Sequence, residues 1–387
     1  MKAVVYGAGN IGRGFIGQIF SLSGYEVVFI DVDEAVVSAL NEDNRYPVCV
    51  ISGDSMSESY VENVRAIDGR NVDAVISEIA SADIMATAVG VNVLGYIAPT
   101  LARSISVRFS DGNSKPLNII ICENKIDADT FLHDLAVSHL NEDEKVLLDS
   151  RVGFVMASVG RMVPVQTNEM KANNILNICT ESYNKLYADK DSFKGGIPDL
   201  VNFEPFSPFS FCIERKLFIH NMGHACAAYL GYLKGYTHIH EAMNDASVYD
   251  IVKRATLCSA AALAKKYTVP IGGLIEHTDD LLLRFRNAGL NDTVARVGGD
   301  PFRKLSTYDR IAGAIRLCAE NDVLCDELYM CMAAGLLFTA NGDKSEADVS
   351  DIIAEHGLSG FLKSHAGLYD SATIDAVSRW TEKLRLY

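Results

Sequence analysis

The feature that most constrains the fold of this chain is a glycine-rich segment near its N-terminus. Residues 1–6 read as a short apolar strand, a helix-like run follows, and between them stands Gly-Ala-Gly-Asn-Ile-Gly, from Gly7 to Gly12. In such a G-x-G-x-x-G pattern the first glycine permits a tight turn, the second lets a pyrophosphate approach the backbone, and the third lets helix and strand pack closely. The helix N-terminus then offers free N–H groups to phosphate. The pattern predicts a dinucleotide-binding unit; the alternative is an ordinary strand-to-helix turn that contains glycine.

An acidic residue at the expected distance supports the dinucleotide interpretation. A second apolar strand runs from Tyr25 to Ile30 and ends at Asp31, the acidic position about 20 residues beyond the glycines that binds ribose in such sites. Val32 and Asp33 follow, so no arginine stands beside Asp31. A carboxylate there accepts hydrogen bonds from a ribose 2′-hydroxyl and repels a 2′-phosphate. The sequence therefore predicts NAD as the cofactor.

Two later strand ends supply further candidates. Residues 82–89 read as a buried strand whose small-residue end is expected to floor the nicotinamide side of the site. Residues 117–122 read as a fifth strand of the βαβ series, followed by Asn124. Since parallel sheets bind ligands at the carboxyl ends of their strands, Asn124 is a site candidate, with loop capping as the alternative. The residues predicted to bind the cofactor are Gly7, Ala8, Gly9, Asn10, Ile11, Gly12, Asp31, Thr87, Ala88 and Val89.

The remainder of the first half reads as α/β. Residues 46–52 and 60–67 alternate as strands of an antiparallel excursion, and residues 152–159 and 175–186 read as strands, the last completing the sheet. Helices are expected at 33–40, at 91–107 with an interruption at Pro99, and at 141–148.

The composition changes after residue 192. Residues 193–209 are rich in proline and glycine and read as a linker. Helical periods then dominate, and helices are expected at 211–233, 242–266, 274–286, 308–320, 324–338, 344–355 and 373–384. We therefore expect a Rossmann-like NAD-binding domain over residues 1–192 and a mostly α-helical substrate and catalytic domain over residues 193–387.

Charge and cysteine usage narrow the partners and the compartment. A net charge of −15 argues against a nucleic-acid-binding protein, which needs a basic face. No apolar run reaches membrane-spanning length, and the N-terminus runs directly into a strand without a signal-peptide pattern. The nine cysteines form no C-x-x-C pair and no zinc-like spacing. These features predict a cytoplasmic protein without a structural metal, acting on a small molecule.

The second half begins with a group of residues suited to proton transfer. Lys216, Asn221 and His224 lie in the segment Glu-Arg-Lys-Leu-Phe-Ile-His-Asn-Met-Gly-His-Ala. In an α-helix they would stand at roughly 0°, 140° and 80°, at about 100° per residue, and so share one broad face. A neutral lysine can accept a proton while an amide and an imidazole hold an oxygen. The alternative is a solvated lysine beside a capping asparagine and a core histidine.

The layout resembles the polyol-specific long-chain dehydrogenases, the mannitol dehydrogenase family. The segments that carry the resemblance span residues 7–310: GAGNIGRGFIG, PLNIIICEN, FKGGIP, ERKLFIHNMGHA and ARVGGDPFRKLSTYDR. The resemblance implies that Lys216 is the general base, that Asn124 and Asn221 hold the alkoxide-like oxygen, and that His224 binds substrate and orients the lysine. It implies hydride transfer to NAD from a polyol or sugar phosphate, without a metal, by a monomer or small homo-oligomer.

Two positions depart from the family pattern. Gly160 stands before Arg161 where an aspartate is usual, which puts any contact from that carboxylate in doubt. His220 stands where an apolar residue is usual; it either faces the site beside Lys216 or is a buried imidazole.

A phosphorylated substrate would need local cations in so acidic a protein. Arg284, Arg286 and Arg310 belong to a cationic group in which the expected substrate residues are Arg296, Arg303 and Lys304. Arginine suits phosphate because its planar fork bonds two oxygens. We expect at least half of the group to pair with Asp292, Asp300 and Asp309 instead. The alternative functions are a dehydrogenase of unphosphorylated hexitols or hexuronates and a non-catalytic NAD-binding regulator.

Overall fold

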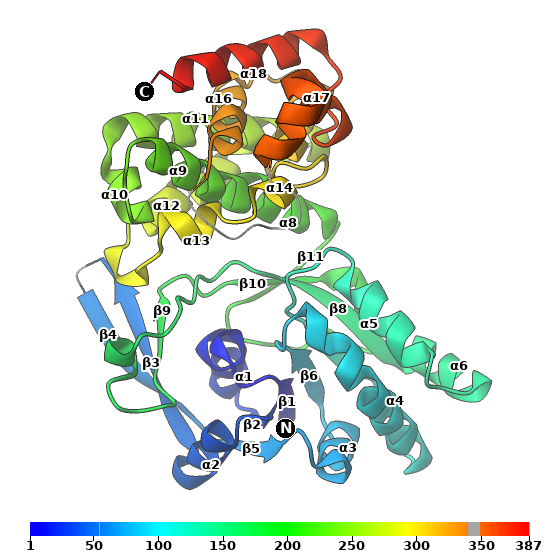
Figure 1. The fold of residues 1–387 in the computed structure, drawn as a ribbon. Helices are drawn as coiled ribbons and strands as arrows, with labels where there is room; N and C mark the ends of the chain where they lie inside the picture. The colour runs from blue at the N-terminus through cyan, green and yellow to red at the C-terminus, as the bar shows by residue number, and fades with distance from the viewer. Residues whose placement is uncertain (54, 340–348, 387) are drawn as a thin grey trace. The chain divides into compact units, whose positions relative to one another are not determined.

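The computed structural model describes residues 1–53, 55–339 and 349–386. The chain divides into two compact units, Met1–Cys212 and Ile213–Tyr387 (Figure 1). The first is an α/β unit built on a mostly parallel sheet and the second is helical, so the predicted fold class is confirmed.

The first unit is organised around an eight-stranded sheet with the order β11-β10-β8-β7-β6-β1-β2-β5. Its strands are β1 (Lys2–Tyr6), β2 (Glu26–Asp31), β5 (Val64–Asp68), β6 (Ile84–Thr87), β7 (Leu117–Ile121), β8 (Val152–Val159), β10 (Leu186–Asp189) and β11 (Phe203–Phe206). The neighbouring strands β5, β2, β1, β6, β7 and β8 pair in parallel, in the Rossmann order. Strand β10 runs antiparallel to β8. The direction of the chain along the sheet reverses between β1 and β6, the point where such sheets bind dinucleotides.

Helices cover both faces of this sheet. Figure 1 shows α3, α4, α5 and α6 along one side and α1 with α2 on the other. Their bounds are α1 (Gly17–Leu22), α2 (Glu34–Asp43), α3 (Val72–Ala80), α4 (Leu94–Ser110), α5 (Ala128–Val137) and α6 (Glu142–Arg151). The predicted interruption at Pro99 was wrong, since α4 continues through it. Proline removes one backbone donor, but the buried Ala98, Leu101 and Ala102 keep the helix on the sheet.

A second, three-stranded sheet has the order β4-β3-β9. Strands β3 (Arg45–Ser52) and β4 (Ser55–Glu62) form the antiparallel excursion, and β9 (Ile178–Glu181) joins β3 in parallel. The expectation of one strand over 60–67 was wrong, because Asn63 adopts a left-handed conformation and separates β4 from β5. The expectation that 175–186 completes the main sheet was also wrong: β9 belongs to the small sheet and β10 closes onto β8.

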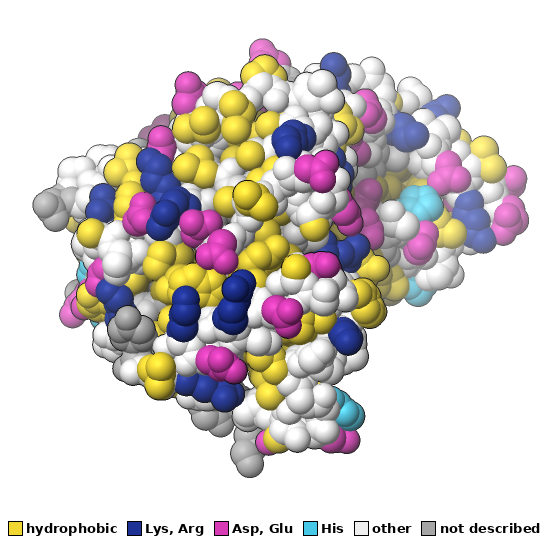
Figure 2. Space-filling view, turned by 90° about the horizontal axis from the view of Figure 1, so that it is seen from above, with side chains coloured by type: hydrophobic (Ala, Val, Ile, Leu, Met, Phe, Trp, Pro, Cys, Tyr) yellow, Lys and Arg dark blue, Asp and Glu magenta, His cyan; other side chains and the backbone are white. Residues whose placement is uncertain are grey.

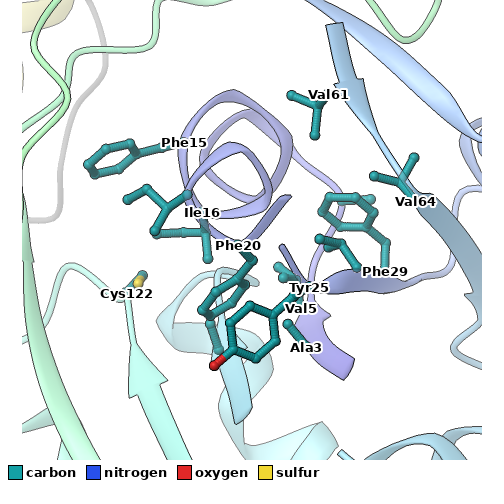
Figure 3. Close-up of a cluster of buried hydrophobic side chains, with 14 of the residues drawn as sticks. Ala3, Val5, Phe15, Ile16, Phe20, Tyr25, Phe29, Val61, Val64 and Cys122 are labelled. Carbon is teal, nitrogen blue, oxygen red and sulfur yellow. The ribbon is translucent and has the colours of Figure 1, made fainter. Parts of the chain in front are cut away.

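The core of the first unit surrounds its first helix. Figure 3 shows Phe15 and Ile16 pointing from this helix to one side, and Phe29, Val61 and Val64 lying on the other. All five side chains are almost fully buried. Since β4 contributes Val61 and β5 contributes Val64, both sheets share one hydrophobic cluster around the helix that follows the glycine-rich loop.

The segment read as a linker contains a strand. Strand β11 is hydrogen-bonded in parallel to β10, so residues 203–206 belong to the first sheet. The predicted boundary at residue 193 lies before this strand, whereas the two compact units meet after Cys212.

The second unit is a bundle of helices. The described helices of this part of the chain are α8 (Ser210–Arg215), α9 (Met222–Leu233), α10 (Ile239–Asn244), α11 (Ala246–Tyr267), α12 (Ile271–Phe285), α13 (Val294–Gly298), α14 (Pro301–Lys304), α15 (Ala312–Glu320), α16 (Asp326–Leu336), α17 (Val349–Ser364) and α18 (Ser371–Leu384). The helix expected over 242–266 is two helices, because Asp245 caps α11. The start of the helix expected over 344–355 lies outside the described residues.

Helix α9 is the centre of this unit. It contacts α10, α11, α13 and α16, and most of its residues are buried. Two glycines allow these helices to approach closely: a β-carbon on Gly223 would lie 2.8 Å from Thr256, and one on Gly231 would lie 2.7 Å from Ala242. A helix that is apolar on every side is typical of the core of a helical domain.

The outer surface carries charges of both signs. Figure 2, seen from above, shows cationic and anionic side chains interspersed with apolar ones on this face. Among the described residues, none of the helices combines the length and apolarity that a membrane span requires.

Candidate active site

The glycine-rich loop has the conformation that its three glycines were expected to provide. Gly7 has a φ of 104°, a left-handed conformation, and a β-carbon there would collide with the Ala88 carbonyl. A β-carbon on Gly12 would collide with the carbonyl of Gly7. In contrast, the β-carbon position of Gly9 faces open space. The loop therefore leaves room at the residue where a pyrophosphate would approach the backbone.

Asp31 lies beside this loop at the end of β2. One carboxylate oxygen accepts the N–H of Ala8 at 2.6 Å, and the other accepts the N–H of Asp33 at 3.0 Å. The N–H of Gly7 bonds to the Ile30 carbonyl at 2.8 Å. The acidic residue and the loop are thus fixed to each other, which sets the distance between the phosphate and ribose positions.

The turn after β6 is held by a carboxylate that the sequence reasoning missed. Glu123 is buried and accepts the N–H of Val89 at 3.0 Å and that of Gly90 at 2.8 Å. Ala88 bonds to the Tyr6 carbonyl, so the turn is tied to both neighbouring strands. Thr87 is fully buried. Asn124, which follows Glu123 in the sequence, does not bond to this turn; it is exposed in the bend after β7.

Lys216, Asn221 and His224 lie on one continuous helical segment, but that segment is not a regular α-helix. A π-turn spans Lys216–Asn221 between α8 and α9, and the N–H of Met222 reaches the Leu217 carbonyl five residues earlier. Residues five apart are separated by roughly 140° in an α-helix and by less in the wider π-turn. The turn therefore brings Lys216 and Asn221 closer to one face than the α-helical count predicts. Such turns occur often at functional sites.

His224 is oriented by two contacts, one from the loop before α13 and one from α12. Its Nε2 lies 3.0 Å from Oδ2 of Asp292, and its ring stacks on Phe285 with centroids 4.7 Å apart. Burial raises the pKa of Asp292, but the hydrogen bond from His224 and the charge of Arg296 outweigh it and hold that pKa below its ordinary value. An ionised carboxylate only accepts, so Nε2 carries the proton and Nδ1 of a neutral His224 is left as an acceptor.

His220 is a buried imidazole, which was one of its two sequence interpretations. It packs edge-on against Phe285, and its ring centroid lies 6.3 Å from that of His224. Burial is the main reason that the pKa of His220 lies well below its ordinary value, and the charge of Arg284 lowers it further. His277 on α12 shows the same effect, since burial lowers its pKa to about 3. Both imidazoles are neutral at pH 7.

The Gly160 position has little room for a carboxylate. A β-carbon there would lie 3.1 Å from the Tyr183 ring, closer than side chains normally pack. The aspartate usual in the family would therefore require Tyr183 to move. The neighbouring Arg161 is buried and bonds within the first unit.

The cationic group of the second unit is largely engaged. Arg296 pairs with Asp292, Arg303 pairs with Asp300 at 2.6 Å and Asp309 at 3.0 Å, and Arg310 pairs with Asp309 at 2.7 Å. The expectation that half of the group would pair with these aspartates is confirmed. Lys304 is buried and donates to the carbonyls of Val297 and Gly299. Arg303 keeps about half of its side chain exposed.

The sequence therefore predicted the candidate groups, but it did not predict the residues that hold them in place. Glu123 stands directly before a candidate and could have been found by asking what satisfies the turn after β6. Asp292 was assigned only to arginine pairing, and no sequence signal joined it to His224. Among the described residues, no group of three or more histidine, cysteine, aspartate or glutamate side chains is arranged to hold a metal ion.

Comparisons with known proteins agree over both units. Residues 1–202 match the family model described as the mannitol dehydrogenase Rossmann domain, and residues 208–371 match the mannitol dehydrogenase C-terminal domain. A protein of Shouchella clausii (strain KSM-K16) named mannitol-1-phosphate 5-dehydrogenase is 40% identical over 361 residues, which is 92% of this chain and 94% of that protein. A protein of the same name from Geobacillus thermodenitrificans (strain NG80-2) is 38% identical over 373 residues, with 96% and 95% covered.

Solved structures support the fold. A D-sorbitol dehydrogenase in substrate-free form has a TM-score of 0.82 at 15% identity, over 100% of this chain and 93% of that one. A mannitol 2-dehydrogenase of Pseudomonas fluorescens, solved with NAD and D-mannitol, has a TM-score of 0.75 at 16% identity, over 100% and 92%. At such identities the likeness establishes a shared architecture and no more.

The lowered pKa values of His220 and His277 determine how stability should depend on pH. Their folded pKa values lie below the 6.5 of an unfolded histidine. Below about pH 7 the unfolded chain therefore binds more protons, and stability is lost as the pH falls. We expect the free energy of unfolding of the second unit to decrease from pH 7 to pH 4, and less steeply in a His220→Leu/His277→Leu variant. Trp380, the one tryptophan, lies in α18 and reports this unfolding by fluorescence.

His356 provides the control, because it is more than half exposed. His356→Leu should leave the pH slope of the wild-type protein unchanged. A double variant as steep as the wild type would show that these imidazoles are not the source of the slope.

Proposed function

The chain belongs to the mannitol dehydrogenase family, and we propose that it is an NAD-dependent dehydrogenase that interconverts D-mannitol 1-phosphate and D-fructose 6-phosphate. The observation that carries the proposal is the helical segment bearing Lys216, Asn221 and His224, with His224 fixed on Asp292. The names of relatives 38–40% identical over most of their length support the choice of substrate.

The residues of the first unit fit the cofactor. The open side of Gly9, the N–H groups of the first helical turn and the carboxylate of Asp31 match a pyrophosphate and a ribose in the expected order. Bound NAD⁺ supplies the acceptor for the hydride that leaves the carbinol carbon. We assign Thr87, Ala88 and Val89, whose turn Glu123 fixes, to the nicotinamide side.

Lys216 is the general base of the proposal. Its neutral amine takes the hydroxyl proton as the hydride leaves, and returns it in the reverse reaction. The amide of Asn221, brought towards the same face by the π-turn, donates to the oxygen as negative charge develops. Asn124 keeps the role of second amide that the family resemblance implies.

His224 acts through its free ring nitrogen. With Nε2–H donated to Asp292, Nδ1 accepts a hydrogen bond from a substrate hydroxyl. The stacked Phe285 prevents the ring from turning, so the acceptor has a fixed direction. A fixed acceptor selects the orientation of the polyol before the proton moves.

The phosphate would be received by the cationic group, with Arg303 as the first choice and Arg296 and Lys304 as further candidates. Arg303 is half exposed, but its guanidinium already faces two carboxylates. This pairing is the specific observation that favours a second candidate function, a dehydrogenase of unphosphorylated hexitols. The two functions can be distinguished by kcat/KM. Removing the phosphate from the substrate should lower kcat/KM under the first function but not under the second.

The cofactor assignment predicts a preference for NAD. A carboxylate at Asp31 repels a 2′-phosphate, so kcat/KM should be higher with NAD⁺ than with NADP⁺. Asp31→Asn keeps an acceptor for the Ala8 N–H and should narrow the difference. Equal values for the two cofactors in the wild-type enzyme would contradict the assignment.

The base assignment predicts that Lys216→Ala lowers kcat by at least about 100-fold, the lower range for removal of a general base. NADH binding, followed by fluorescence titration, should stay near that of the wild type. Lys253→Ala is the matched control, since Lys253 lies in the same unit and pairs with Asp279. Because ammonium and amide groups polarise the oxygen, activity should survive prolonged EDTA treatment. A Lys216→Ala enzyme with wild-type turnover would refute the role.

The substrate assignment is tested with fructose 6-phosphate and fructose under NADH. We expect kcat/KM to favour the phosphorylated sugar, and Arg303→Ala to raise KM for fructose 6-phosphate more than KM for fructose. Arg254→Ala is the control, because Arg254 is equally exposed and also pairs with two carboxylates, those of Asp250 and Glu327. Equal efficiency with both sugars would favour the second candidate function.

A further inference from the structure

We propose that Tyr46 and Arg161 are positioning residues for the dinucleotide, because they hold the turn after the glycine-rich loop in a π-helical form. The inference rests on the proposed NAD binding of the first unit. It concerns two side chains that lie outside the loop itself, on β3 and after β8.

The helix after the loop contains a π-turn close to its start. This turn spans Gly12–Ile16, and the N–H of Gly17 bonds to the carbonyl of Gly12, five residues earlier. In an α-helix the same N–H would bond to the carbonyl of Arg13. The Arg13 carbonyl therefore loses its usual backbone donor at the point where the loop becomes a helix.

Tyr46 donates to that carbonyl. Its hydroxyl lies 2.8 Å from the oxygen of Arg13, and its side chain is fully buried. A buried carbonyl without a donor is costly, so the tyrosine hydroxyl stabilises the π-turn relative to an α-helical start. A β-carbon on Gly17 would lie 2.6 Å from the same hydroxyl, so glycine is needed for Tyr46 to reach the helix.

Arg161 holds the next carbonyl. One guanidinium nitrogen donates to Gly14 at 3.0 Å and to the Gln18 side chain at 2.6 Å. The Nε and the other nitrogen donate to the carbonyl of Glu181, on β9, at 3.0 and 2.9 Å. This buried guanidinium thus joins the π-turn to the small sheet, and it stacks near the Phe15 ring that Figure 3 shows beside the helix.

The π-turn is connected to the phosphate-binding loop by Arg13. The backbone carbonyl of Arg13 is held by Tyr46, while its side-chain Nε donates to the carbonyl of Ala8 at 2.7 Å. Ala8 lies between Gly7 and Gly9, so a shift of the turn moves the backbone that faces the pyrophosphate. Burial lowers the pKa of Arg161 to about 10, and the group is therefore still charged at pH 7. Two buried cations, Arg13 and Arg161, then add to the positive end of the helix.

Two substitutions test the inference. Tyr46→Phe removes one hydroxyl and should raise the Kd for NADH about 3- to 10-fold, the range of a single net hydrogen bond. Arg161→Met removes four donated hydrogen bonds and should raise it by at least about tenfold. Both enzymes should keep kcat within about twofold at saturating NADH, because the side chains act on binding alone.

Matched controls separate this role from a general loss of stability. Arg108→Met also removes a buried guanidinium, one that donates to the carbonyls of Ala80, Ala82 and Lys115 away from the loop. Tyr229→Phe removes a buried hydroxyl in the second unit. Both controls should bind NADH with the wild-type Kd, measured by fluorescence titration of protein whose folding is checked by circular dichroism.

Each outcome decides a different point. If wild-type protein does not bind NADH, the proposed function fails and this inference fails with it. If wild-type protein binds but folded Tyr46→Phe and Arg161→Met bind equally well, only this inference is overturned. Controls that weaken binding as much as the test variants would also overturn it. Should Arg161→Met not fold, Tyr46→Phe against Tyr229→Phe decides alone.

Discussion

The burial of most of helix α9 is the constraint on which the second unit depends. Four helices pack around it, and its glycines and alanines let their backbones approach closely. A helix enclosed in this way cannot rotate or slide without opening cavities on several sides. The polar groups at its N-terminal end, Asn221 and His224, are therefore positioned by apolar packing well beyond them. Their precision comes from the core, and the hydrogen bond to Asp292 only selects the orientation of the ring.

In both units the helical segment that bears candidate site residues departs from regular α-helical structure. In the first unit a π-turn lies close to the start of the helix after the glycine-rich loop, and in the second a π-turn spans Lys216–Asn221. A π-turn forfeits regular backbone hydrogen bonds and persists only where the surroundings compensate. In the first unit the compensation is visible, since Tyr46 and Arg161 supply donors to the carbonyls of Arg13 and Gly14. The irregular geometry is thus supported by side chains from distant parts of the chain.

Local patterns in the sequence predicted what local physics controls. The glycines, Asp31 and the alternation of apolar runs gave the dinucleotide-binding half, and helical periods gave the other half. What failed depended on distant residues: β9 joins β3 across more than a hundred residues, and no period within 175–186 distinguishes that pairing from one with β8. Glu123 was overlooked because its value lies in satisfying the N–H groups of Val89 and Gly90. The π-turns have no signature in the residue types, because they arise from the packing around them.

The carboxylate shared by His224 and Arg296 links the interior of the second unit to the solution around it. Asp292 and His224 are both mostly buried, whereas Arg296 has more than half of its side chain exposed. Dissolved ions screen an exposed pair strongly and a buried one weakly. Added salt therefore weakens the pair between Arg296 and Asp292 but leaves the contact between His224 and Asp292 in place. The carboxylate of Asp292 then interacts mainly with His224. Through Arg296, the ionic strength of the solution therefore affects how strongly Asp292 interacts with His224.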